Sequence, residues 1–205
     1  TMADGGLPCI VKTVEELTGL DIPYAGLVTF DGVVDLSKAV GGVRVCVNAE
    51  ISDPNTDLHL TKGWHTLIGQ SALAFLRTRH GVGDGSDLGR ISNQQVFMSA
   101  LMRKVKSENL LANPLTLYSM SKAIVSNMTL STSLNSPDVL AAMAMAVRGV
   151  DLNKMVFVQY PGTTGGSGVY SGKVQPDKTA AAQLFAALKA DKPVVITGGL
   201  GRGST

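Results

Sequence analysis

The chain has 205 residues, of which 44% are hydrophobic and 17% are charged, and its formal net charge is +2. This length and hydrophobic content suffice for one sizeable core, so we predict a single domain over residues 1–197 and a disordered tail over 198–205. The near-neutral charge argues against the broad basic surface of nucleic-acid binders. No apolar run is long enough to cross a bilayer.

Helix and strand signals alternate in the first part of the chain. Pro8 occupies a first helical position, Asp31 is placed to cap a second helix, and Gly41 follows that helix as a stop signal. The elements predicted here are a helix from Pro8 to Gly19, a strand over 24–30, a helix over 31–40 and a strand over 43–47. Such alternation is typical of layered α/β folds.

A polar stretch separates these elements from the next helix. Residues 48–63 contain an Asp-Pro-Asn turn signal at 53–55, which predicts an excursion over the surface. The following helix carries Phe75, and a glycine-rich loop over 80–86 comes after it. Because this loop lacks the terminal Gly-Lys-Ser/Thr of a P-loop, we do not assign it to nucleotide binding.

The remainder of the chain is predicted to be mostly helical. A long helix capped by Ser86 or Asp87 runs to about Lys106. The elements expected beyond it are helices over 115–125 and 139–148, a strand over 155–160, a glycine-rich loop over 161–172 and a helix over 177–189. The methionines of this part fill the core more readily than they bind a cofactor, although methionine could also line an apolar groove that suits lipid chains.

The two cysteines, Cys9 and Cys46, are too few for a zinc site, which needs four closely spaced ligands. Neither lies beside a histidine in the sequence, as a nucleophile could. Two interpretations stay open, of which the first is a pair of buried thiols. The second is a disulfide that contributes roughly 4 kcal/mol in the chain-entropy model and implies an oxidising, extracytoplasmic setting.

Polar groups that suit an anion concentrate in one stretch near the middle of the chain. Arg77 and Arg79 end one helix, and Asp87, Arg90 and Gln94 begin the next. The last three lie at i, i+3 and i+7, on one helical face near the N-terminus, where backbone N–H groups favour anions. Since arginine offers phosphate two parallel hydrogen bonds and a charge that does not titrate, the stretch predicts a polyanion site.

Geometry and competing ion pairs both bear on this prediction. Arg77 and Arg79 stand two residues apart, so both can face a ligand only where the backbone between them is extended or bent. The alternative is that the arginines form surface ion pairs with Asp84 and Asp87, each of which contributes little stability. Spacing alone leaves both interpretations open.

The arginines belong to a longer pattern, whose most specific part is the pair followed by Asp-x-x-Arg-x-x-x-Gln. The other positions in the pattern are Gly41-Gly42-Val43, Leu60 to Gly63, Leu67, Gly69 and Ala72-Leu73. This pattern closely resembles the LytR-CpsA-Psr (LCP) family from Gly5 to Gln94, and more weakly to Pro193. Residues 13–15 and the placement of the two cysteines resemble the actinobacterial branch, where such a pair is bridged.

The resemblance implies an α/β fold with three layers, α/β/α, around a central mixed sheet. It also implies an enzyme at the extracytoplasmic face of the cell membrane, associated with the membrane through an upstream anchor that is not in this chain. Such an enzyme binds an undecaprenyl-pyrophosphate-linked glycopolymer, with the lipid in an apolar tunnel and Mg²⁺ at the pyrophosphate. It transfers the glycan phosphate to peptidoglycan, and no nucleic acid is expected as a partner.

Residue roles follow from the same resemblance. Arg77, Arg79 and Arg90 would hold the phosphates, and Gln94 would add a hydrogen bond. Asp87 would act with Arg90 in catalysis, by orienting the arginines, holding the metal or assisting the attacking hydroxyl. Phosphoryl transfer needs positioning and charge neutralisation more than covalent help from the protein, so these residue types suit the chemistry.

The chain departs from the family pattern at its start. The aspartates that hold magnesium, and an Arg-Asp pair that follows a proline, would precede Gly5, so we assign the metal to no residue and expect this chain alone to be inactive. Two other functions stay open: a non-catalytic polyprenyl-phosphate or cell-wall binding protein, and a DNA-binding transcriptional attenuator. The second would need a basic recognition helix, which the sequence does not show, and a disulfide would not suit the cytosol.

Overall fold

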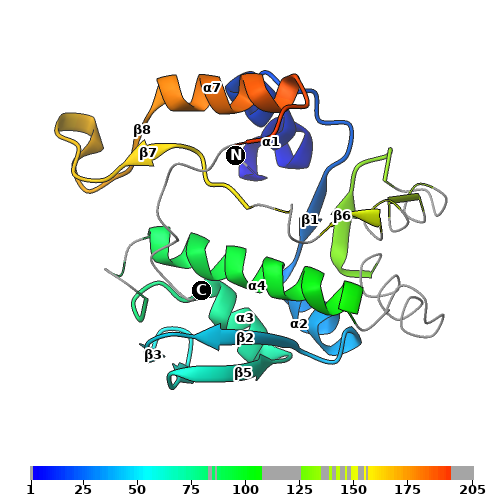
Figure 1. The fold of residues 1–205 in the computed structure, drawn as a ribbon, viewed down its shortest axis with the longest axis vertical. Coiled ribbons are helices and arrows are strands. Elements are labelled where there is room, and N and C mark those ends of the chain that lie inside the picture. Colours follow the sequence, from blue (N-terminus) through cyan, green and yellow to red (C-terminus); the bar gives the residue numbers. More distant parts are fainter. Residues whose placement is uncertain are drawn as a thin grey trace. The chain divides into compact units, whose positions relative to one another are not determined.

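The computed structural model describes residues 2–82, 85, 87–107, 126–134, 139, 142, 143, 146, 149–151, 155 and 157–194 (Figure 1). The chain divides into two compact units, one formed by Thr1–Ala25 with Val158–Gly198 and the other by Gly26–Phe157 with Gly199–Thr205. Both units contain helices and strands, so the predicted α/β class is confirmed. One domain over residues 1–197 stays a prediction.

Two helices in contact dominate the first unit, α1 (Met2–Thr18) and α7 (Lys178–Lys189). Helix α1 bends at Gly6, whose φ of 61° and ψ of −156° are not helical, so Pro8 lies in the first turn of the part after the bend. Asp177 caps α7 by accepting hydrogen bonds from two backbone N–H groups at 3.0 and 2.9 Å. The helices predicted near Pro8 and over 177–189 are therefore confirmed. The smaller elements of this unit are β7 (Gly162–Thr163), η3 (Gly168–Tyr170) and β8 (Gln175–Pro176).

The second unit alternates short strands with helices. Its elements are β1 (Gly26–Val28), α2 (Phe30–Ala39), β2 (Val43–Val47), β3 (Ile51–Asp53), β4 (Leu58–Leu60), β5 (Gly63–Leu67), α3 (Gln70–Arg77), α4 (Asp87–Ser107) and β6 (Met128–Leu130). The described strands pair two by two and antiparallel, β1 with β6, β2 with β5, β3 with β4 and, in the first unit, β7 with β8. The strand predicted over 43–47 matches β2 residue for residue.

The core of this unit forms where α3 and α4 lie over the β2–β5 pair (Figure 1). Val43, Val45 and Val47 are at most 1% exposed, and they join Phe75 of α3 and Phe97 of α4 in one cluster. Alternate residues of a strand face the same side, so β2 turns all three valines toward the helices. Burial of each such side chain contributes roughly 1.5–3 kcal/mol, and this packing fixes the two helices that carry the arginine stretch.

The stretch predicted as a surface excursion is in fact folded, and that prediction was wrong. Strands β3 and β4 form a hairpin whose Ile51, Leu58 and Leu60 are at most 8% exposed and belong to the core. Each strand has only three residues, too few for the alternation of polar and apolar side chains to stand out. Strand β5 was also missed, because its outer face carries Trp64, 63% exposed, with the Arg44 guanidinium of β2 stacked 4.5 Å from the ring centroid.

The N-cap of helix α2 is Thr29, two residues before the predicted cap, Asp31. Thr29 has extended backbone angles, and its hydroxyl accepts a hydrogen bond from the N–H of Gly32 at 3.0 Å. Threonine is itself a preferred N-cap, so a cap at Thr29 agrees with its residue type. Strand β1 is shorter than the predicted 24–30 because Thr29 and Phe30 already serve the helix.

Several predictions for the second half concern residues outside those described. They are the helix over 115–125, the tail over 198–205 and most of the helix over 139–148. Within the predicted strand over 155–160, the described residues form no strand, so that prediction was wrong for them. The run has the composition of a strand, but none of the described strands pairs with it.

Candidate functional site

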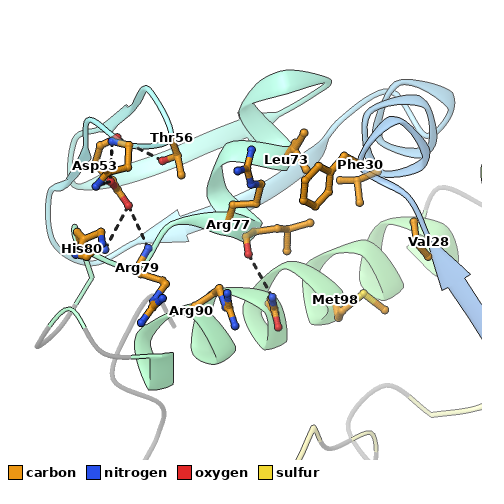
Figure 2. Close-up of a pocket in the computed structure, with 14 residues that line it drawn as sticks. Val28, Phe30, Asp53, Thr56, Leu73, Arg77, Arg79, His80, Arg90 and Met98 are labelled. Carbon is orange, nitrogen blue, oxygen red and sulfur yellow. Dashed lines mark hydrogen bonds between the residues drawn. The ribbon is translucent and has the colours of Figure 1, made fainter. Parts of the chain in front are cut away.

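A cavity of about 700 Å³ lies in the second unit, bounded by the ends of α3 and α4 and by the β3–β4 turn. Its lining combines an apolar set with a polar and charged set. The apolar set is Val28, Phe30, Val33, Leu73, Leu76 and Met98, and the polar set is Asp53, Asn55, Thr56, Arg77, Arg79, His80, Arg90 and Gln94. In Figure 2, Arg79, His80 and Arg90 lie on one side of the cavity, and Val28, Phe30 and Met98 lie on the other.

The end of α3 directs both paired arginines toward this cavity. Thr78 ends the helix with φ −59° and ψ 133°, an extended conformation, and its side chain is fully buried. The Thr78 hydroxyl donates to the carbonyl of Ala74 at 2.9 Å. Because alternate residues of an extended segment face the same side, Arg77 and Arg79 both line the cavity. The extended backbone that the two-residue spacing required is therefore present.

Arg77 is held by an aromatic ring as well as by its helix. Its guanidinium carbon lies 4.7 Å from the ring centroid of Phe30, which begins α2 and is 59% exposed. A stacked guanidinium keeps its N–H donors at the edge, available to a second partner. No sequence pattern predicted this contact, because the two residues are far apart in the chain.

Helix α4 contributes one face to the cavity, with Arg90, Gln94 and Met98 spaced four residues apart. The Gln94 side-chain amide donates to the carbonyl of Leu76 in α3 at 3.2 Å, which joins the two helices at the site. Four of the predicted site residues, the three arginines and Gln94, are therefore brought together in one cavity. Their roles in binding and catalysis stay predictions.

A buried carboxylate that sequence reasoning missed lies at the polar end. Asp53 is 1% exposed, and its two oxygens accept four hydrogen bonds. Oδ1 accepts from the backbone N–H and the side-chain amide of Asn55 at 3.0 and 3.2 Å, and Oδ2 accepts from the N–H groups of Arg79 and His80 at 3.1 and 3.3 Å. Figure 2 shows Asp53 between the hairpin turn and this arginine segment. The Asp-Pro-Asn signal predicted the turn but not the second set of partners.

These hydrogen bonds set the charge state of Asp53. Burial raises the pKa of the carboxyl, but the N–H donors of Arg79, Asn55 and His80 stabilise the ionised form and outweigh it. The net pKa of Asp53 lies below its ordinary value of 3.8, so the group is a carboxylate at neutral pH.

Asp87 begins α4, as predicted, but its side chain lies outside the described part, and so does Asp84. The ion-pair alternative for the arginines therefore stays a prediction. Cys9 and Cys46 belong to different units and are half-buried free thiols in this structure, so the disulfide also stays a prediction. In the described part of the chain, no helix is long and apolar enough to cross a membrane.

The described residues do not fit a magnesium site. Among the described lining residues, Asp53 alone is a carboxylate, and N–H donors already engage both of its oxygens. Nowhere in the described ranges do three His, Cys, Asp or Glu side chains gather closely enough to hold an ion. Mg²⁺ therefore stays an expectation from the family resemblance.

Comparison with known proteins shows that most of the chain is similar to cell-wall proteins. A family model described as the LytR_cpsA_psr family matches residues 1–190. "Cell wall biosynthesis protein LcpA" of Corynebacterium glutamicum is 31% identical over 83% of this chain and 32% of its own length. The Bacillus subtilis protein "Polyisoprenyl-teichoic acid--peptidoglycan teichoic acid transferase TagT" is 36% identical over 51% of this chain and 34% of its own. The chain thus spans about a third of the length of these relatives.

Solved structures share the fold. B. subtilis TagV gives a TM-score of 0.74 at 22% identity, over 93% of this chain and 73% of that chain. A structure of TagT bound to LI-WTA gives a TM-score of 0.65 at 24% identity, over 94% of this chain and 70% of that chain. At such identities, the likeness establishes the fold alone.

The match to the family model extends well beyond the arginine pattern. It includes every residue that lines the cavity, and it continues through α7. The C. glutamicum relative agrees with the actinobacterial character of the pattern. The family resemblance that the arginine stretch indicated is therefore confirmed along nearly the whole sequence, and the chain belongs to the LytR-CpsA-Psr family.

Proposed function

We propose that this chain forms the donor-binding part of a cell-wall glycopolymer phosphotransferase. The enzyme would move a glycan phosphate from an undecaprenyl-pyrophosphate-linked donor to a hydroxyl of peptidoglycan. One observation carries the proposal: a single cavity combines three guanidinium groups with a set of apolar side chains. This combination suits a ligand that is both a polyanion and a lipid.

The arginines supply what phosphoryl transfer requires from a protein. Arg77, Arg79 and Arg90 would neutralise the pyrophosphate and hold it by paired hydrogen bonds, with Gln94 adding one more. Positioned cations stabilise the charge that develops on the leaving phosphate more effectively in a partly enclosed site than in water. Arg90 and Asp87 retain the catalytic roles predicted for them, as part of this proposal.

The apolar side chains would take the start of the polyprenyl chain. Phe30 and Met98 are 59% and 42% exposed although each lines the cavity. Covering apolar surface stabilises a complex by roughly 25 cal/mol per Å², so a hydrocarbon chain laid over these residues would add affinity that inorganic pyrophosphate lacks. Methionine adapts to the irregular shape of such chains.

The names of the relatives support the setting of the reaction. LcpA is named for cell-wall biosynthesis, and TagT for the transfer of teichoic acid to peptidoglycan. By analogy, we propose that this chain works at the extracytoplasmic face of the membrane, in association with it. A bridge between Cys9 and Cys46 would suit that oxidising location.

A second function, binding without transfer, is favoured by one feature of the cavity. The Asp53 carboxylate is fully engaged by N–H donors, which leaves the described lining without a carboxylate to accept a proton from an attacking hydroxyl. A polyprenyl-phosphate binding protein would need only the arginines and the apolar side chains. Release of labelled glycan phosphate to a peptidoglycan acceptor separates the two functions, since the binder would hold the lipid without turnover.

Calorimetric titration with a short-chain polyprenyl pyrophosphate tests the ligand class. We expect saturable binding by the wild-type chain, and binding at least roughly tenfold weaker by Arg79→Ala, because a charged hydrogen-bonding partner is lost. Arg103→Ala is the matched control, since Arg103 is exposed on the same helix as Arg90 but does not line the cavity. Equal affinities for all three proteins would refute the assignment of the arginines.

A further inference from the structure

We propose that Asp53 is a positioning residue for the anion site: its buried carboxylate fixes the backbone at Arg79 and His80, and thereby the direction in which the arginine pair faces the ligand. The inference rests on the proposed function in one respect, that the arginines bind an anionic group. It adds a residue on a different element, the end of β3, which acts through the arginines and not on the ligand.

The hydrogen bonds of Asp53 run to both sides of the site. Oδ2 accepts from the consecutive N–H groups of Arg79 and His80, which are the first backbone groups beyond the end of α3. Oδ1 accepts twice from Asn55, which keeps the carboxylate from rotating away. With all four bonds made and 1% of the residue exposed, Asp53 has little capacity left to bind a ligand itself.

Two further contacts hold the same segment against the hairpin. The hydroxyls of Thr56 and Thr78 lie 2.8 Å apart, and Thr56 also donates from its backbone N–H to the Asp53 carbonyl at 3.2 Å. On the other side of the arginine, Gly81 lies so close to β3 that an added β-carbon would stand 2.7 Å from the carbonyl oxygen of Ser52. The segment from Thr78 to Gly81 is thus fixed at both ends, and Asp53 holds its middle by hydrogen bonds from two backbone N–H groups.

Whether loss of the Asp53 charge weakens or tightens anion binding distinguishes positioning from simple electrostatic repulsion. A carboxylate near an anion site repels the anion, so removing its charge should tighten binding if Asp53 acted only through its field. If Asp53 acts by holding Arg79, its loss should weaken binding, because the guanidinium must then be ordered at the expense of binding free energy. A residue that served only the stability of the hairpin would change the unfolding transition and leave the affinity of the folded protein unchanged.

The test compares the affinity of the whole chain for inorganic pyrophosphate in wild type, Asp53→Asn and Leu58→Val. Leu58 is the β4 partner of Asp53 in the hairpin, is 5% exposed and does not line the cavity, so its variant destabilises the same hairpin without touching the arginines. We expect roughly tenfold weaker binding by Asp53→Asn, unchanged binding by Leu58→Val, and faster hydrogen exchange at the N–H groups of Arg79 and His80 in Asp53→Asn alone.

Unchanged or tighter binding by Asp53→Asn would overturn the inference. Should Asp53→Asn fail to fold, Asn55→Ala takes its place, because it keeps the carboxylate but removes the side-chain amide that holds Oδ1. It should weaken binding by a smaller factor, and an affinity equal to that of wild type would count against positioning. Arg79→Ala separates the two proposals: if it binds pyrophosphate as wild type does, the proposed function fails, whereas an effect of Arg79→Ala without any effect at Asp53 or Asn55 refutes the positioning role alone.

Discussion

Adding one methyl group at Gly81 should disturb the anion site without changing any side chain in it. A β-carbon there would meet the carbonyl oxygen of Ser52 at 2.7 Å and the backbone carbon and nitrogen of Ser52 at 2.9 Å. These atoms belong to β3, whose next residue, Asp53, is held by four hydrogen bonds, so the strand cannot retreat without breaking them. Overpacking of this kind costs about 1–3 kcal/mol, and we expect Gly81→Ala to lower the free energy of unfolding by that amount.

Urea unfolding followed by circular dichroism measures this change, and pyrophosphate titration measures its consequence for the site. Affinity should fall together with stability, because relief of the clash moves the backbone that carries Arg79. Gly149→Ala is the control, since nothing lies within 4 Å of the β-carbon added there. It should stay within about 0.5 kcal/mol of wild type or gain slightly. A Gly81→Ala protein as stable as the control, with wild-type affinity, would refute the close packing of this segment on β3.

Three further predictions address neighbouring contacts. Phe30→Leu keeps apolar surface but removes the ring beneath Arg77, so calorimetry should show pyrophosphate binding about two- to fivefold weaker, and an unchanged Kd would count against the stacked arrangement. Thr29→Ala should lower the free energy of unfolding by about 1 kcal/mol, with rescue by Thr29→Ser, and equal stability of all three proteins would contradict the cap. Because the pKa of Asp53 is lowered in the folded state, its stabilising contribution is present above pH 3.8 and is lost as pH falls through the lowered pKa. As pH is lowered through this range, the free energy of unfolding should therefore fall more steeply for wild type than for Asp53→Asn.

Local patterns predicted the arginine site because its residues follow one another closely in the chain. Arg77 is the last residue of α3, Arg79 follows two residues later, and Arg90 and Gln94 lie near the start of α4. The contact between α3 and α4 brings all four to one cavity. Helical spacing also identified the face of α4 on which Arg90 and Gln94 lie. The two-residue spacing of the arginines required an extended or bent backbone between them, and Thr78 has an extended backbone in the structure.

Other parts of the site depend on contacts between distant segments, which no local pattern contains. The Asp53 carboxylate belongs to a turn by its sequence, but its partners at Arg79 and His80 follow only from the packing of the β3–β4 hairpin against α3. Phe30 likewise belongs to the site through a contact between distant segments, the stacking of Arg77 on its ring. The hairpin itself was missed because strands of three residues are too short to reveal their period, so no pattern in the sequence predicted the element that holds the arginines.

Nuclear magnetic resonance of the chain with a short-chain polyprenyl pyrophosphate tests the central claim most directly. The side-chain N–H signals of Arg77, Arg79 and Arg90 report on the polar side of the cavity, and the methyl signal of Met98 reports on the apolar side. We expect all four to shift together on addition of the lipid pyrophosphate, and the arginine signals alone to shift with inorganic pyrophosphate. Shifts at Arg103 in place of these signals, or no change at the three arginines, would contradict a pyrophosphate-binding cavity at this site.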